Sequence, residues 1–80
     1  MRRVTIYSTP TCTFCRMSKD FFKANGVEYT ELDVASDIEA RKKMLEISNQ
    51  MGVPVIDIDG NIIVGFNKPK LAALLGLSGQ

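Results

Sequence analysis

The sequence contains no histidine and no tryptophan, and it has only two cysteines, Cys12 and Cys15. The lack of histidine removes the commonest general base and the commonest metal ligand, so any chemistry must come from other residues. A disulfide-rich scaffold is excluded by the cysteine count. A bridge between residues three apart closes almost no loop, so it restricts the unfolded chain very little. Stability therefore does not explain this pair.

The sequence also lacks an excess of charge of either sign and any long apolar run. Ten basic residues against nine acidic ones give a formal net charge of +1, which provides no long-range attraction for nucleic acid or an anionic membrane. No apolar run approaches the length that spans a bilayer. The start, Met1-Arg2-Arg3, leads directly into Val4 without the apolar core of a secretory signal. We therefore expect a cytoplasmic protein, and nothing calls for more than a monomer.

Hydrophobic residues make up 45% of the 80 residues, which predicts a folded chain. No repeat, linker or low-complexity tract interrupts it, so we expect one domain over residues 1–80. Periodicity predicts strand, helix, strand, helix, strand, strand and helix, over residues 2–7, 12–25, 27–32, 36–49, 53–58, 61–65 and 70–75. A parallel βαβ unit followed by a hairpin predicts an α/β fold, in which three helices cover a four-stranded mixed sheet.

Local signals support the ends of these elements. Asn25-Gly26 is typical of a left-handed helix C-cap, and Ser36-Asp37-Ile38-Glu39 has the form of a capping box that opens the second helix. Asp59-Gly60 is the strongest short signal for a β-hairpin turn. We therefore expect the last two strands to pair directly with each other.

The cysteines open the first predicted helix, directly after a strand, which is the context of a redox motif. A helix N-terminus presents unpaired amides and a partial positive charge, and both favour a thiolate. At about 100° per residue, Cys12 falls on the charged, exposed face and Cys15 at its boundary. The opposite, apolar face is expected to contain Phe14, Met17, Phe21 and Phe22. The phase thus predicts that Cys12 attacks and that Cys15, which is shielded, resolves.

Other interpretations of these residues stay open. The pair could be half of a zinc site, although structural zinc takes four ligands and the chain has no third cysteine. Both cysteines could be ordinary core residues. Arg16 and Lys19 either stabilise the Cys12 thiolate, attract an anionic substrate, or are solvated. Taken alone, the Val53-Pro54 bond is expected to be trans, which is the common form.

A longer pattern surrounds the cysteines. The run Tyr7-Ser8-Thr9-Pro10-Thr11-Cys12-Thr13-Phe14-Cys15 is followed by Gly52-Val53-Pro54-Val55 and by Gly65-Phe66. These segments resemble the glutaredoxin family of the thioredoxin superfamily, in order and at family spacing over nearly the whole chain. The Gly-Phe run with Asn67-Lys68-Pro69-Lys70-Leu71 is most similar to NrdH-redoxins and small prokaryotic glutaredoxin-like proteins. The resemblance implies a thioredoxin fold, βαβαββα.

The resemblance also implies an activity, a dithiol thiol–disulfide oxidoreductase that reduces protein or glutathione mixed disulfides. Cys12 would be the nucleophile, Cys15 the resolving thiol, and Pro54 a cis-proline facing them. No metal and no bound cofactor are implied, because the redox-active group is the Cys12–Cys15 disulfide, reduced by glutathione or thioredoxin reductase. Substrate would be bound by residues around the motif, namely Thr11, Thr13, Phe14, Val53, Pro54, Gly65 and Phe66.

The chain departs from the typical dithiol glutaredoxin at three places. Thr13-Phe14 replaces Pro-Tyr between the cysteines, Thr9 replaces a lysine, and Gly65-Phe66-Asn67-Lys68 lacks the second glycine and the acid of a Gly-Gly-x-Asp-Asp stretch. Losing that cation and that acid removes charge-assisted hydrogen bonds to glutathione. These losses favour thioredoxin reductase as donor and, as in NrdH-redoxins, ribonucleotide reductase as acceptor.

An alternative function from a different class is a scaffold that holds an iron–sulfur cluster together with glutathione. The bridging form of such scaffolds usually has one active-site cysteine. The presence of Cys15 therefore counts against this alternative.

Overall fold

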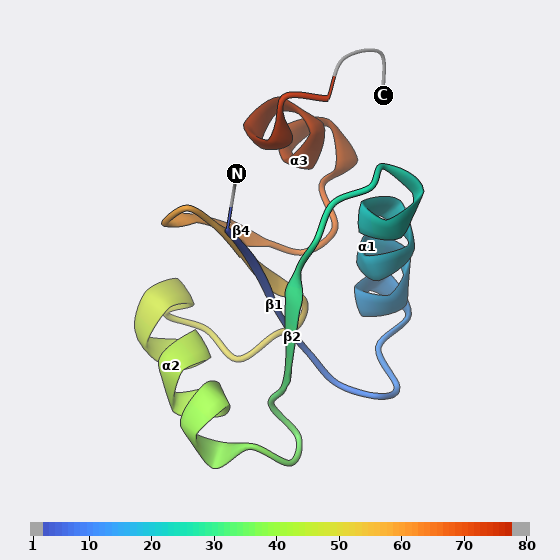
Figure 1. Cartoon of the computed structure of the whole chain (residues 1–80). Coiled ribbons are helices and arrows are strands. Elements are labelled where there is room, and N and C mark those ends of the chain that lie inside the picture. The colour runs from blue at the N-terminus through green and yellow to red at the C-terminus, as the bar shows by residue number, and fades with distance from the viewer. Residues whose placement is uncertain (1–2, 78–80) are drawn as a thin grey trace.

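The computed structural model describes residues 3–77, and Figure 1 shows how its elements are arranged. In this range the strands are β1 (Val4–Ser8), β2 (Thr30–Asp33), β3 (Val55–Ile58) and β4 (Asn61–Val64), and the helices are α1 (Thr13–Ala24), α2 (Ile38–Ser48) and α3 (Lys68–Leu75). The strands form one sheet in the order β2-β1-β3-β4. Strands β1 and β2 are parallel, and the other two pairs are antiparallel. The expected thioredoxin fold is confirmed.

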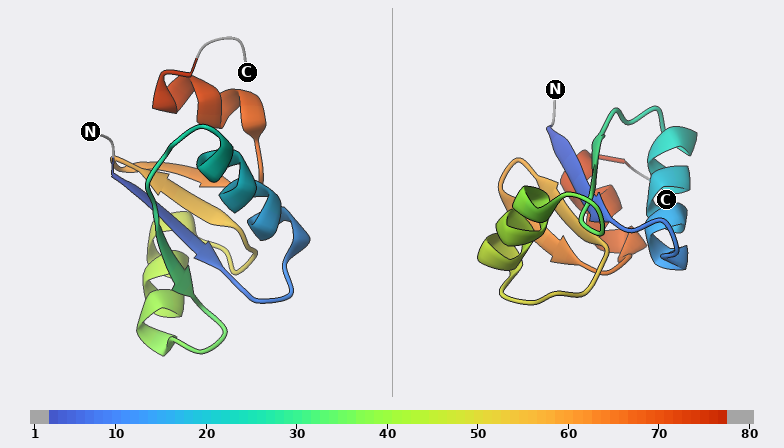
Figure 2. Two further views of the ribbon diagram at one scale, coloured as in Figure 1. Left: turned by 45° about the vertical axis from the view of Figure 1, so that its right-hand side comes forward. Right: turned by 90° about the horizontal axis from the view of Figure 1, so that it is seen from below.

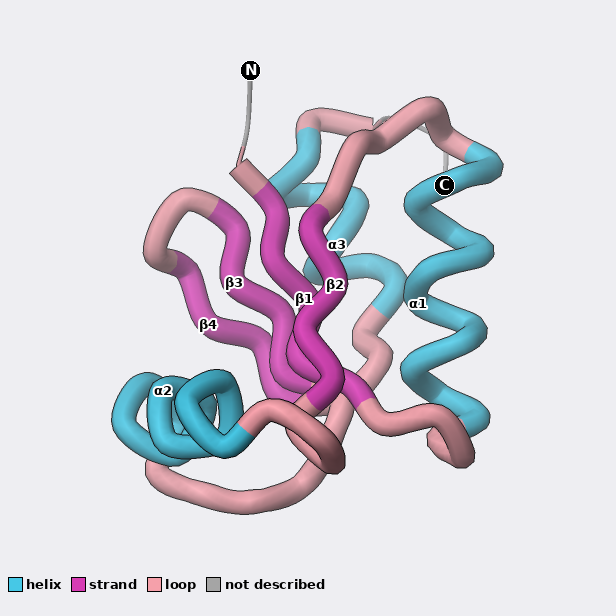
Figure 3. Tube along the Cα trace, turned by 60° about the horizontal axis from the view of Figure 1, so that its bottom comes forward, coloured by secondary structure: helices cyan, strands magenta, loops and turns pink. Residues whose placement is uncertain are grey.

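The helices lie in two layers, one on each face of the sheet. Helices α1 and α3 cover one face of the sheet and α2 covers the other, as Figures 2 and 3 show. Each layer encloses its own apolar cluster. Phe22 and Leu71 pack on the first face with Ile6, Ile56 and Ile63, whereas Met44 and Ala40 pack on the second with Tyr7 and Val55. Complete burial of a side chain such as Phe22 contributes about 2–3 kcal/mol.

The turn between β3 and β4 forms as its dipeptide predicts. Asp59 has φ 51° and Gly60 has φ 91°, and positive φ at both central residues is what a tight two-residue hairpin needs. The carboxylate of Asp57 accepts a hydrogen bond from the Gly60 amide at 2.8 Å. The turn is thus specified locally.

Two strands begin later than the sequence predicts. The amide of Val27 donates to the carbonyl of Phe22 at 2.8 Å, so this part of the chain completes the end of α1, and β2 begins only at Thr30. Strand β3 begins at Val55, directly after Pro54, because proline has no amide to donate to a strand ladder. The predicted first residue of β1, Arg2, lies outside the described residues.

Two helices begin at caps that the sequence analysis did not select. The cap of α2 is Asp37, whose carboxylate accepts from the Ala40 amide at 3.1 Å, and not the expected Ser36. Helix α3 begins at Lys68 because the Asn67 side chain accepts from the Lys70 amide at 3.2 Å. Among the described residues, no helix has the length and apolar character needed to cross a membrane.

Candidate active site

The register of the sheet brings four loops to one end. Strand β1 ends at Ser8, and β2 ends beside it. Strand β3 runs in the opposite direction, so its first residue, Val55, pairs with Tyr7 of β1 and with Val64 of β4. The loops after β1, after β2, before β3 and after β4 therefore lie at this end (Figure 3). We call this end, marked by Ser8, Val55 and Val64, the cysteine end, because the first of these loops leads to the cysteine pair.

Cys12 is the N-cap residue of α1. Its backbone is extended, and its Sγ accepts a hydrogen bond from the Cys15 amide at 3.1 Å. Its own amide donates to the Thr9 carbonyl at 3.3 Å. The sulfur thus occupies the place of a capping oxygen, where the free amides of the helix point toward it. Its side chain is half-buried, so Cys12 is less open than the helical phase predicts.

Cys15 lies one turn into α1 and is fully buried. The pKa of its thiol is raised to about 12, mainly by burial and next by the hydrogen bond with Cys12. A backbone hydrogen bond with Thr9 and the positive charge of Lys19 lower this pKa, but to a smaller extent. The two cysteines are unbridged here. They therefore differ in exposure.

The peptide bond between Val53 and Pro54 is cis. The resemblance implies this geometry, and the trans bond expected from the dipeptide alone is wrong. Pro54 is fully buried and Val53 is half-buried. The carbonyl of Pro54 accepts a hydrogen bond from the Gly65 amide at 2.8 Å. The loop before β3 and the loop after β4 are thereby tied together at the cysteine end.

The apolar face predicted for α1 is wrong in its first half. Phe14 is 58% exposed and Met17 is 43% exposed, whereas the buried stripe of the helix consists of Cys15, Ser18, Phe21 and Phe22. A polar residue fits this stripe because the Ser18 hydroxyl donates to the Phe14 carbonyl at 2.8 Å. The stripe that faces the sheet is therefore rotated toward Cys15, which leaves two large apolar side chains in solvent.

The remaining candidate residues lie on the surface around the motif. Thr11 and Thr13 are exposed, and Gly65 and Phe66 are half-buried. The Phe66 ring meets the ring of Phe21 edge-on, with 6.1 Å between the centroids.

A shallow groove of about 490 Å³ runs along α1 beside this ring pair. Its walls include Met17, Phe21 and Phe66, and the polar side chains of Asp20 and Lys68 lie at its edge. The groove joins the exposed side of α1 to the loop after β4.

A polar cluster that sequence reasoning did not find joins β1, β2 and α1. One oxygen of Glu31, Oε2, accepts from the hydroxyl of Ser8 at 3.0 Å and from Nζ of Lys19 at 2.7 Å. Ser8 is 1% exposed. These residues lie 23 and 12 positions from Glu31, so no local signal could have revealed the cluster. Lys19 is therefore held by a carboxylate, and it is not a freely solvated cation.

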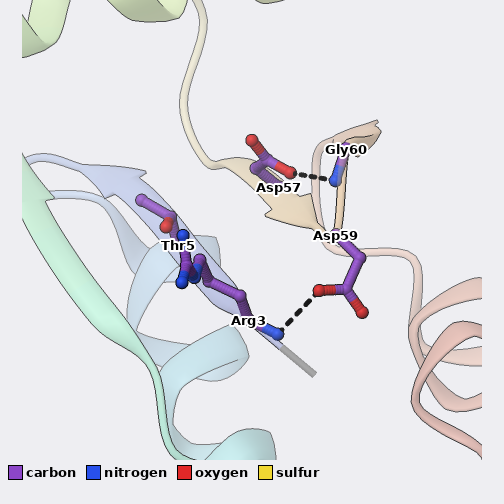
Figure 4. A pocket seen from close by; sticks show the side chains of 5 residues that line it. All are labelled: Arg3, Thr5, Asp57, Asp59 and Gly60. Carbon is purple, nitrogen blue, oxygen red and sulfur yellow. Dashed lines mark hydrogen bonds between the residues drawn. The ribbon is translucent and has the colours of Figure 1, made fainter. Parts of the chain in front are cut away.

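A second polar hollow, of about 470 Å³, lies at the opposite end of the sheet, which we call the hairpin end (Figure 4). It is lined by Arg3, Thr5, Asp57, Asp59 and Gly60. Its carboxylates bond to backbone groups, since Asp59 accepts from the Arg3 amide at 2.9 Å and Asp57 from the Gly60 amide. No cysteine lies at this end. Over residues 3–77, no group of three or more histidine, cysteine, aspartate or glutamate side chains could hold a metal ion.

Comparison with known proteins decides the family. The family model described as glutaredoxin matches residues 4–63, which include both cysteines, Pro54 and three of the four strands with part of the fourth. The chain belongs to the glutaredoxin family. A glutaredoxin-like 8.6 kDa protein from the rubredoxin operon of Clostridium pasteurianum is 47% identical over 72 residues, which cover 90% of this chain and 96% of that protein.

Further relatives extend this likeness to named glutaredoxins and to solved structures. A glutaredoxin of Neisseria meningitidis is 37% identical over 67 residues, or 82% of this chain and 79% of that protein. The crystal structure of a variant of the thioredoxin-like protein BC3987 is similar with a TM-score of 0.90 and 36% identity, and it covers 98% of this chain and 100% of that one. This glutaredoxin thus has the same fold as the BC3987 variant over nearly its whole length.

In this glutaredoxin, the positions that depart from the typical family pattern have local structural partners. The carbonyl of Thr9 accepts from the Cys12 amide, and Asn67 uses its side chain to cap α3. Neither side chain carries a charge. At the positions compared in the sequence analysis, the neutral Thr9 therefore replaces a lysine, and the cation Lys68 replaces an acid.

Proposed function

We propose that this glutaredoxin is a dithiol thiol–disulfide oxidoreductase that reduces protein disulfides through Cys12 and Cys15. The observation that carries the proposal is the unequal placement of the two sulfurs. Cys12 caps α1 and is partly open to solvent, whereas Cys15 is buried one turn further on. An accessible sulfur can meet a substrate, and a buried one can react only with its neighbour.

The proposed reaction has two exchange steps. The thiolate of Cys12 attacks one sulfur of the substrate disulfide, and the electron pair of the broken S–S bond leaves on the other substrate sulfur. Cys15 then loses its proton and attacks Cys12, which releases the substrate as a dithiol and leaves a Cys12–Cys15 disulfide. Two electrons pass to the substrate. An outside donor must then reduce the disulfide again.

The substrate segment is proposed to lie across the loops of the cysteine end. Thr11 and Thr13 flank Cys12 and are exposed. Phe14, with 58% of its surface free, offers an apolar contact directly beside the motif. Extended substrate backbone is proposed to pair with Val53 next to Pro54, because a strand added alongside gains main-chain hydrogen bonds.

The half-buried Gly65 and Phe66 complete this proposed surface on the side of the groove along α1. Phe66 forms one wall of that groove. A substrate side chain that enters there would bury apolar surface on binding, which is favourable.

The donor that we favour is thioredoxin reductase and not glutathione. Thr9 supplies no cation and Lys68 supplies no acid for the two charged ends of glutathione. Charged hydrogen bonds are roughly twice as strong as neutral ones, so their absence weakens glutathione binding. The resemblance to NrdH-redoxins suggests ribonucleotide reductase as the acceptor. One chain supplies both cysteines, so we propose a monomer, and we propose that it acts in the cytoplasm.

The proposal is tested by supplying each donor separately. The oxidised protein is mixed either with NADPH and thioredoxin reductase or with NADPH, glutathione and glutathione reductase, and NADPH oxidation is followed in the presence of a protein disulfide. We expect faster turnover with thioredoxin reductase. Faster turnover with glutathione would contradict the choice of donor. No turnover with either donor or with a chemical dithiol would contradict the activity itself.

A further inference from the structure

We infer that Lys19, held in place by Glu31 and Ser8, speeds the resolving step by stabilising the negative charge that develops on Cys15. This inference rests on the proposed function and concerns its second exchange step. It assigns a role to the polar cluster of Ser8, Lys19 and Glu31, which has none in the exchange steps described above.

The first observation is where Lys19 lies. Cys15 and Lys19 are four residues apart on α1, so their side chains occupy the same face, one turn from each other. Cys15 is fully buried, and the lysine side chain is only 23% exposed. A charge is felt more strongly where water is partly excluded. The cation therefore lies partly out of solvent on the helix face that carries the buried sulfur.

The second observation is how the lysine is held. Its Nζ lies 2.7 Å from Oε2 of Glu31, the oxygen that also accepts from the buried hydroxyl of Ser8. The hydrogen bond with Glu31 raises the pKa of Lys19, and the hydrogen bond with Lys19 lowers the pKa of Glu31. Both groups thus stay charged at neutral pH. Glu31 and Ser8 are positioning residues, because they fix the lysine and not the sulfur.

The third observation concerns what changes during the reaction. Two of the effects that raise the pKa of Cys15 come from Cys12, namely its hydrogen bond and its charge. Each of them is smaller than the effect of burial. They disappear once Cys12 is bonded to the substrate, because the mixed disulfide is uncharged. Burial then opposes ionisation, while the Thr9 hydrogen bond and Lys19 favour it. Of the ion pair, Lys19 is the member whose charge acts on Cys15.

The step itself balances without a further reactant. Cys15 gives its proton to solvent, and its sulfur forms a bond to Sγ of Cys12. The bond between Cys12 and the substrate sulfur breaks, and the electron pair leaves with the substrate, which takes a proton from solvent. The charged and titratable groups that act on Lys19 are Glu31, Tyr29 and Cys15. Lys19 keeps its proton throughout and lowers the energy of the anionic sulfur.

The experiment separates the two exchange steps with an uncharged dithiodipyridine as substrate. The fully reduced protein is mixed with one equivalent, and stopped-flow absorbance follows the pyridinethione released first by Cys12 and then by Cys15. In Lys19→Met we expect an unchanged first phase and a second phase slowed about twofold to fivefold. The pH profile of the second phase should also move to higher pH. Lys19→Arg should restore most of the rate, because it restores the charge.

The matched control is Lys23→Met, which removes the same charge one turn further along α1, where the side chain is exposed. It should leave both phases unchanged. A second phase in Lys19→Met equal to that of the control, or an equal loss in both phases, would overturn the inference. A wild-type protein that releases no pyridinethione at all would instead contradict the proposed function, so the two failures are distinguishable.

Discussion

At the hairpin end of the sheet, the carboxylates of Asp57 and Asp59 accept hydrogen bonds from backbone amides and fix a turn. At the cysteine end, the amide of Cys15 points at a sulfur, and two large side chains near it stay in solvent. At the hairpin end, the polar side chains form hydrogen bonds with neighbouring backbone groups. At the cysteine end, a half-buried thiol and two apolar side chains remain accessible to another molecule. Changes at the cysteine end should therefore alter activity with little effect on stability, and changes at the hairpin end should do the reverse.

The largest expected effect is at Cys12. The change Cys12→Ser replaces the attacking sulfur with a hydroxyl that does not exchange with disulfides, so the reduction of a protein disulfide should fall to the uncatalysed rate. The rate is measured by NADPH oxidation with the donor that works for the wild type. Retained turnover would show that the chemistry does not begin at Cys12.

A smaller but distinctive effect is expected at Cys15. The change Cys15→Ser leaves the first exchange intact and removes the second, so a mixed disulfide between Cys12 and the substrate should accumulate. Intact-mass spectrometry under non-reducing conditions detects the adduct. The double change Cys12→Ser with Cys15→Ser is the control and should show none. An adduct that appears on Cys15 in Cys12→Ser instead would reverse the proposed order of attack.

A moderate effect is expected at Phe14. The side chain is 58% exposed and packs against little, so Phe14→Ala should leave the thermal midpoint unchanged while KM for a protein substrate rises about threefold to tenfold. Leu45→Ala is the matched control, because Leu45 is also exposed, at 45%, but lies on α2. Equal KM values in the two variants would show that Phe14 takes no part in binding.

The smallest effect on activity is expected at Gly60. A change at this residue tests whether the hairpin end affects stability and not activity. Gly60 has φ 91° and open space where a Cβ would lie. Gly60→Ala should therefore cost about 1–2 kcal/mol of unfolding free energy through the backbone alone. Urea unfolding measures the loss, and turnover should stay at the wild-type rate. A fall in turnover without a fall in stability would link the hairpin end to the reaction.

The parts of the fold that could be predicted are those with local causes. The order of strands and helices follows from periodicity, and the turn at Asp59-Gly60 follows from the two positive φ angles that this dipeptide accepts. The difference in exposure between Cys12 and Cys15 follows from the spacing of two residues at a helix start. Each of these features is decided by residues close together in the sequence.

The parts that were missed depend on packing between distant segments. The exposure of Phe14 and Met17 follows from which side of α1 meets the sheet, and residue type alone does not say which apolar side chain is covered. The bonds from Ser8 and Lys19 to Glu31 connect three elements that only the fold brings together. The cis bond at Pro54 came from the family resemblance, because the dipeptide by itself favours trans.

The capping of α1 by Cys12 has a consequence for the energy balance between the two redox states. A thiolate is a strong acceptor for the Cys15 amide at 3.1 Å, and a disulfide sulfur is a weak one. In the proposed cycle, each oxidation would therefore weaken the cap of the helix that holds both cysteines, and each reduction would restore it. The stronger cap would stabilise the reduced form relative to the oxidised form. The reduction potential of the couple would therefore be higher, and the oxidised protein would accept electrons more readily. In the proposed cycle, the geometry at the start of α1 would thus contribute to the reduction potential of the Cys12–Cys15 couple.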